Sequence, residues 1–167
     1  MTLWGYRELT NGRSVYHFFR SEEKYCTVSC LKIGSIKNLT LTRKSGGSLD
    51  ALSSTFDMDE TVFRGMKRYI SDGVSGKQVG VLELKDLRGM YSINDRYLVK
   101  NNGTATTFWD TENPGAPVAK ITMDSMFLRK KNPLLAANFG CYILVSEDTV
   151  DETAALLFLL FPEMRPM

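Results

Sequence analysis

The sequence predicts a mostly-β fold, a single antiparallel β-barrel of roughly ten to twelve strands around a buried hydrophobic C-terminal helix. Two observations predict it. The body of the chain alternates short β-prone runs with turn signals, which is typical of a sandwich or a barrel. An unbroken apolar run from Ala154 to Phe161 then follows. Because no linker or fixed-period repeat is visible, we expect one domain over residues 1–167.

The apolar run indicates a helix over about residues 150–161. The spacing of Thr149 and Glu152 fits a capping box, in which the Thr hydroxyl and the Glu carboxylate each accept a hydrogen bond from the other residue's backbone amide. Pro162 is expected to end the helix. The helix is apolar on every side and, at about 12 residues, shorter than the roughly 20 that span a bilayer. We therefore expect the strands to surround it.

The strands are predicted from runs rich in β-branched and aromatic residues between turn signals. The strongest turn is Asn101-Asn102-Gly103, because Asn and Gly tolerate the positive φ of tight hairpins. Leu49–Asp59 fits a short helical turn or an irregular excursion, and Met126–Lys130 continues a strand or turns back. The predicted strands are Ser14–Arg20, Tyr25–Ile33, Asn38–Lys44, Val62–Ile70, Lys77–Leu84, Met90–Ile93, Arg96–Lys100, Thr104–Trp109, Val118–Met123 and Phe139–Val145.

Two other architectures stay open at this point. A lipocalin-like barrel would place the helix outside, where a polar helix face is needed, and this helix has none. A β-sandwich could pack the helix against one open side, but Leu or Phe side chains would then lie in water unless a partner covered them. The barrel interior is the location that buries all of them.

Composition excludes several classes of protein. With 21 basic and 19 acidic residues, the net charge of +2 is too even to indicate a nucleic-acid partner. The three cysteines show no disulfide framework, and Cys26 and Cys30 are expected on one face of a strand as small buried hydrophobes. The N-terminus lacks the pattern of a secretory signal, and no run is long enough for a transmembrane segment. A cytoplasmic location is expected, with the nucleus or a peripheral membrane site as the alternatives.

The residue pattern offers little support for catalysis. His17 is the only histidine, and it lies inside a predicted strand, where an ordinary strand histidine is expected. Asp57, Asp59 and Glu60 form an acidic cluster without the glycine or the distant glutamate of a calcium-binding loop. No dinucleotide, P-loop, zinc-protease or paired-cysteine motif is present. We expect no enzyme activity, no cofactor and no metal site.

Three segments carry a resemblance to a known family. They are Tyr91–Asp95, Gly115–Ile121, and Cys141–Val145 followed by Asp151-Glu152 and the apolar helix. They resemble the tubby-like C-terminal fold superfamily of tubby proteins, plant LURP-one-related proteins and phospholipid scramblases, with the LURP-one-related branch nearest. The resemblance covers Phe63 to Phe161 and implies a roughly twelve-stranded barrel around the helix. The calcium-binding and cysteine-rich segments of scramblases are absent, so scrambling is not implied.

Basic residues give the first hypothesis for function. Arg129, Lys130 and Lys131 form the densest cluster, and Lys67 and Arg68 lie within a predicted strand. Tubby proteins bind phosphoinositides through basic side chains on the barrel, so the resemblance implies a similar role here. Each basic residue near an anionic membrane surface contributes about 1 kcal/mol to binding. We therefore expect a non-enzymatic module for an anionic lipid or membrane surface, with these five residues as phosphate contacts.

The alternative hypothesis belongs to a different class. The chain could be a protein–protein interaction module or a structural subunit of a larger assembly. Its contact surface would then use the apolar side chains of Leu134-Leu135-Ala136-Ala137, Met164 and Met167.

Overall fold

The computed structural model describes residues 1–33, 36–44, 48–52, 67–85, 89–124, 126, 130 and 141–164. Within these ranges the chain forms twelve β-strands followed by the helix α2, Glu152–Met164. The strands are β1 Thr2–Thr10, β2 Arg13–Arg20, β3 Glu23–Ile33, β4 Ile36–Arg43, β5 Ser48–Leu52, β6 Lys67–Asp72, β7 Gln78–Leu84, β8 Tyr91–Ile93, β9 Tyr97–Asn101, β10 Ala105–Asp110, β11 Pro117–Met123 and β12 Cys141–Ser146.

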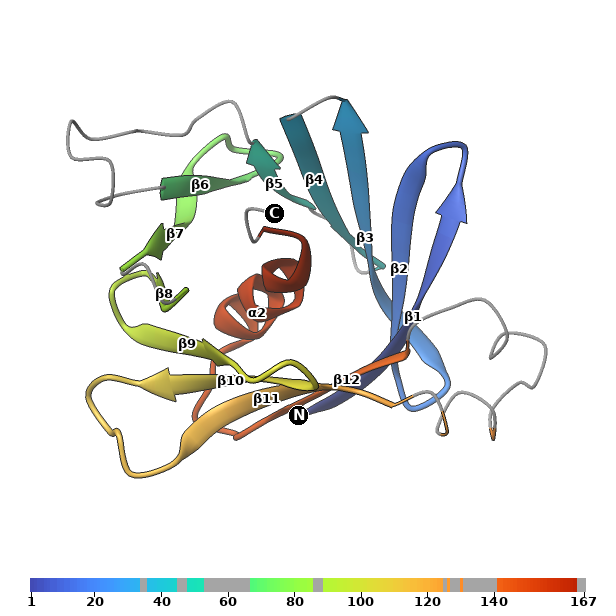
Figure 1. The fold of residues 1–167 in the computed structure, drawn as a ribbon. Helices are drawn as coiled ribbons and strands as arrows, with labels where there is room; N and C mark the ends of the chain where they lie inside the picture. The colour runs from blue at the N-terminus through green and yellow to red at the C-terminus, as the bar shows by residue number, and fades with distance from the viewer. Residues whose placement is uncertain are drawn as a thin grey trace.

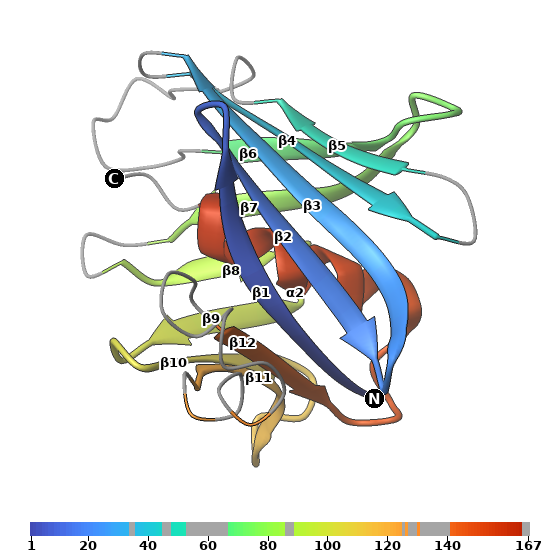
Figure 2. The same cartoon turned by 90° about the vertical axis from the view of Figure 1, so that its right-hand side faces the viewer.

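All twelve strands belong to one antiparallel sheet. Each strand pairs with its neighbour in the sequence, and the order then returns from β12 to β1. Figure 1 shows the strands arranged around α2, and Figure 2 shows the helix lying along the sheet's inner face. The predicted mostly-β class and antiparallel pairing are confirmed. A two-sheet sandwich is excluded, because the described strands form a single sheet.

Two of the twelve strands were not predicted from the sequence. The first is β1, which contains Gly5, a residue that strands usually avoid. A Cβ at Gly5 would lie 2.5 Å from Cδ1 of Phe18 and 2.6 Å from the carbonyl oxygen of His17, so only glycine fits there. The second is β5, which occupies the start of the ambiguous Leu49–Asp59 segment. The rest of that segment, and most of Met126–Lys130, lie outside the described residues.

The core forms between the inner face of the sheet and α2. Every side chain from Ala154 to Phe161 is at most 5% exposed, which confirms that the helix is buried on all sides. A helix on the outside of a lipocalin-like barrel is therefore excluded. Phe158 stacks on Phe108 of β10 with ring centroids 4.1 Å apart, and Tyr97 of β9 meets the Phe158 ring edge-on at 5.0 Å. These aromatic contacts fix the helix against β9 and β10.

Both ends of the helix differ from the sequence prediction. The capping box at Thr149 is wrong, because Asp151 is the cap: its Oδ1 accepts a hydrogen bond of 2.8 Å from the amide of Ala154. Glu152 instead accepts a 2.5 Å hydrogen bond from the hydroxyl of Tyr25. Nor does the helix stop at Pro162, since it continues to Met164. A proline in the last turn removes only one helix hydrogen bond, so the helix can pass it and end shortly afterwards.

The cysteine and turn predictions hold where the structure describes them. Cys26 and Cys30 both lie inside the sheet, 1% and 4% exposed. The turn after β9 places Gly103 at a φ of 91°. The turn between β8 and β9 uses Asn94 and Asp95, with φ of 55° and 54°, which is the backbone of a tight hairpin.

Candidate functional site

The interior of the sheet is already occupied. The side chains of α2 fill it, and Phe108, Phe158 and Phe161 are all 0% exposed. A ligand inside the ring of strands would have to displace these aromatic side chains, each of which contributes about 1.5–3 kcal/mol by being buried. A binding function therefore has to use the outer face of the sheet or its rim.

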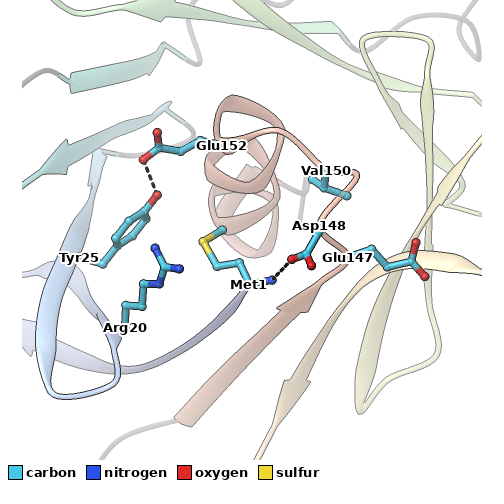
Figure 3. Close-up of a pocket in the computed structure, with 7 residues that line it drawn as sticks. All are labelled: Met1, Arg20, Tyr25, Glu147, Asp148, Val150 and Glu152. Carbon is cyan, nitrogen blue, oxygen red and sulfur yellow. Dashed lines mark hydrogen bonds and ion pairs between the residues drawn. The ribbon is translucent and has the colours of Figure 1, made fainter.

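One rim holds a cavity of about 270 Å³ beside the start of α2 (Figure 3). The hydroxyl of Tyr25 donates to Glu152 across this cavity, and burial together with this hydrogen bond raises the pKa of Tyr25. Asp148 lies 3.7 Å from the amino group of Met1. The cavity is lined by Met1, Arg20, Tyr25, Glu147, Asp148, Val150 and Glu152. Three carboxylates against one arginine and the amino group of Met1 make this rim unsuitable for an anionic headgroup.

Of the basic residues predicted to form the site, Lys67 and Arg68 lie on opposite faces of the sheet. Lys67 is on the outer face, where its Nζ is 3.8 Å from a carboxylate oxygen of Glu83. Arg68 is only 3% exposed, since the next residue along a strand points to the opposite face. Burial lowers the pKa of Arg68. Lys130 is exposed, and Arg129 and Lys131 lie outside the described residues.

Acidic partners offset the charge of several lysines and arginines near β6–β9. The Nζ of Lys85 lies 2.7 Å from Glu83 and 2.6 Å from Asp95. These two hydrogen bonds raise the pKa of Lys85 and hold it in the charged form. Arg96 pairs with Asp110 at 2.9 Å, and the guanidinium lowers the pKa of that carboxyl. In this part of the outer face, the positive charges of the basic side chains are therefore offset by neighbouring carboxylates.

A second group of basic residues, on β9–β11, was missed by the sequence prediction. Lys100 and Lys120 are both exposed and lie on either side of Thr107 in the register of the sheet. Trp109, also on β10, lies under Lys100, whose Nζ is 4.9 Å from the ring centroid. The two lysines are twenty residues apart in sequence and belong to no basic run, so only the strand register brings them together.

Other chemistry is sparse in the part of the chain that the structure describes. His17 lies 2.9 Å from a carboxylate oxygen of Glu8 on the neighbouring strand, as an ordinary strand histidine would. Across the described ranges, no group of three or more His, Cys, Asp or Glu side chains is placed to hold a metal ion. No helix in those ranges has the length and apolarity needed to cross a bilayer.

These features define a class: a β-sheet protein whose interior is filled by its own helix and whose outer face carries ion-paired basic residues near β6–β9 and exposed lysines on β9 and β11. Comparison with protein-family models, with curated proteins and with solved structures found no match.

Proposed function

We propose that the ring of strands is a closed β-barrel of the tubby-like type. Support comes from the pairing of β12 back onto β1 over five residue positions, from Thr2–Tyr6 to Val145–Cys141. The helix inside the ring fits what the resemblance implies. Hydrogen exchange tests closure: the paired amides of β1 and β12 should be protected as strongly as those of β2 and β3. Exchange at the rate of an exposed edge strand would mean that the sheet is open.

We further propose that the protein is a non-enzymatic binding module for an anionic lipid or membrane surface. The observation that carries this proposal is the combination of a filled interior with exposed lysines on the outer face. Lys100, Lys120 and Lys130 are exposed, whereas Lys67 and Lys85 have acidic partners. An uncompensated lysine attracts phosphate more strongly than one in an ion pair.

Co-sedimentation with vesicles tests this function. The protein should bind vesicles that contain phosphatidylserine or a phosphoinositide and bind much less to pure phosphatidylcholine, with binding that weakens as salt is added. Replacing Arg129, Lys130 and Lys131 together by Ala should weaken binding to the anionic vesicles at a given salt concentration. Equal binding to neutral and anionic vesicles, unchanged in this triple variant, would overturn the proposal.

Exposed apolar side chains favour the second candidate, a protein-interaction module or assembly subunit. In the described part of the chain, Val145 is 51% exposed and Met126 is 58% exposed. Light scattering after size exclusion distinguishes the two candidates. A monodisperse monomer that binds vesicles supports the lipid module, and a stable oligomer without vesicle binding supports the subunit.

A further inference from the structure

We propose that the outer face of β9–β12 around Lys100, Trp109, Lys120 and Val145 is the surface that contacts an anionic membrane. These four residues define the Lys100–Lys120 face. This inference rests on the proposed function and specifies which side of the molecule performs it. It also differs from the sequence-based choice of Arg129, Lys130 and Lys131.

Strand register places these residues together. Lys100 pairs with Thr107, Thr107 pairs with Lys120, and Lys120 pairs with Val145 on β12. Their side chains point outward, because Val99, Ala119 and Ile121 beside them in the sequence are at most 5% exposed and face the core. Adjacent strands are about 4.8 Å apart, so the α-carbons of the two lysines lie about 10 Å apart. Flexible lysine side chains at this spacing can approach the same phosphate or two neighbouring ones.

Charge distinguishes this face from its neighbours. Within the residues that the structure describes, neither Lys100 nor Lys120 forms an ion pair, whereas Lys67, Lys85 and Arg96 all do. The row from Lys100 through Thr107 and Lys120 to Val145 contains no carboxylate. Glu147, just beyond β12, is the nearest acidic residue along that strand and belongs to the rim cavity. Among the described residues, the face therefore presents two positive charges without an acidic partner.

The aromatic and apolar residues on the same face indicate a membrane rather than a soluble anion. The indole Nε1 of Trp109 donates a 3.0 Å hydrogen bond to Thr107, which holds the half-buried ring against the sheet beneath Lys100. Val145, 51% exposed, lies directly opposite Lys120. Trp favours the boundary between headgroups and acyl chains, and lysine places its ammonium among the phosphates above it. A free phosphate would gain nothing from the exposed valine.

The first test replaces Lys100 and Lys120, and it uses the ion-paired Lys67 and Lys85 as the matched control. Each of Lys100→Gln and Lys120→Gln should lower the partition coefficient onto phosphatidylcholine vesicles containing phosphatidylserine about fivefold, and the double variant about 25-fold. The control, Lys67→Gln with Lys85→Gln, removes the same charge from a compensated region and should have little effect. Circular dichroism confirms that all variants fold.

The second test uses the two tryptophans of the chain as reporters. In Trp4→Phe the only indole is Trp109, and its fluorescence should shift to the blue and be quenched by brominated lipid when anionic vesicles are added. In Trp109→Phe the remaining indole is Trp4, which pairs with Ile143 two positions from Val145 and stacks on Phe19, at the β1 border of the Lys100–Lys120 face. Its signal should change less than that of Trp109, because it lies farther from Lys100.

The outcomes separate this inference from the proposed function. Loss of binding in the double lysine variant, with quenching of Trp109, supports both. Vesicle binding that persists in the double variant overturns the Lys100–Lys120 face but leaves the lipid function standing. No binding to anionic vesicles by the unaltered protein overturns both. Binding of inorganic phosphate or inositol phosphate without vesicle binding overturns the membrane as the source of the anion.

Discussion

Gly80 on β7 lies in direct contact with Leu157 on α2. A Cβ built at Gly80 would be 3.0 Å from Cδ2 of Leu157 and 3.1 Å from its Cδ1, which is closer than ordinary van der Waals contact. The same Cβ would be 3.4 Å from Cδ1 of Ile70. The absence of a side chain at this one strand position therefore lets the helix approach the sheet.

Adding a methyl group at Gly80 should destabilise the fold. Gly80→Ala is expected to lower the free energy of unfolding by about 1–3 kcal/mol, because overpacking forces Leu157 or the backbone to move. Urea denaturation measures the change. Gly115→Ala is the control, since nothing lies within 4 Å of a Cβ there. Adding Leu157→Ala should make the Gly80 substitution less costly, and strict additivity of the two effects would argue against the contact.

The helix cap provides a direct comparison between structure and sequence pattern. Asp151→Ala should lower the free energy of unfolding by about 1 kcal/mol, because the amide of Ala154 loses its partner. Thr149→Ala should change it by less than about 0.5 kcal/mol, as for surface positions in general. Thermal denaturation of the two variants measures both. A larger loss of unfolding free energy for Thr149→Ala than for Asp151→Ala would support the capping box at Thr149 instead of the Asp151 cap.

Tyr25 should make stability depend on alkaline pH. Its folded pKa is raised above the ordinary value of 10.0 by burial and by the hydrogen bond to Glu152. The folded state therefore retains the proton longer than the unfolded state, so this contribution is fully present below about pH 10 and is lost as pH rises toward the folded pKa. Tyr25→Phe should be less stable at neutral pH, and its difference from the unaltered protein should shrink above pH 10. A difference that stays constant with pH would contradict the linkage.

The buried thiols should be unreactive in the native protein. Cys26 is 1% exposed, and burial raises its pKa to about 12, so almost none of it is thiolate at neutral pH. In a Cys141→Ser variant, which leaves Cys26 and Cys30, a disulfide reagent should label neither thiol until denaturant unfolds the chain. Stoichiometric labelling within minutes in native buffer would show that the sheet opens far more readily than its packing indicates.

Local patterns predicted the parts of this fold that depend on neighbours in the sequence. The turn at Asn101-Asn102-Gly103 follows from residues that tolerate positive φ. The burial of Ala154–Phe161 follows from a helix without a polar face. β1 was not predicted, and it contains Gly5, a residue of low strand propensity. Glycine is needed at this position because a Cβ would clash with the ring of Phe18 on β2. A pattern of neighbouring residues in the sequence cannot predict that contact between two strands.

The candidate surface also depends partly on local sequence pattern and partly on tertiary structure. The alternation of side chains along a strand is enough to place Lys120 opposite to Ala119 and Ile121, as the exposure of all three shows. It is wrong for the ends of the same strand, because Val118 is only 8% exposed and Met123 is 58% exposed. Which strands adjoin, and in which register, depends on pairings between distant segments, and a shift of one residue would turn each side chain to the other face. The grouping of Lys100 with Lys120, the compensation of Lys67 by Glu83 and the burial of Arg68 were therefore decided by the tertiary structure alone, because charge and exposure depend on neighbours in space.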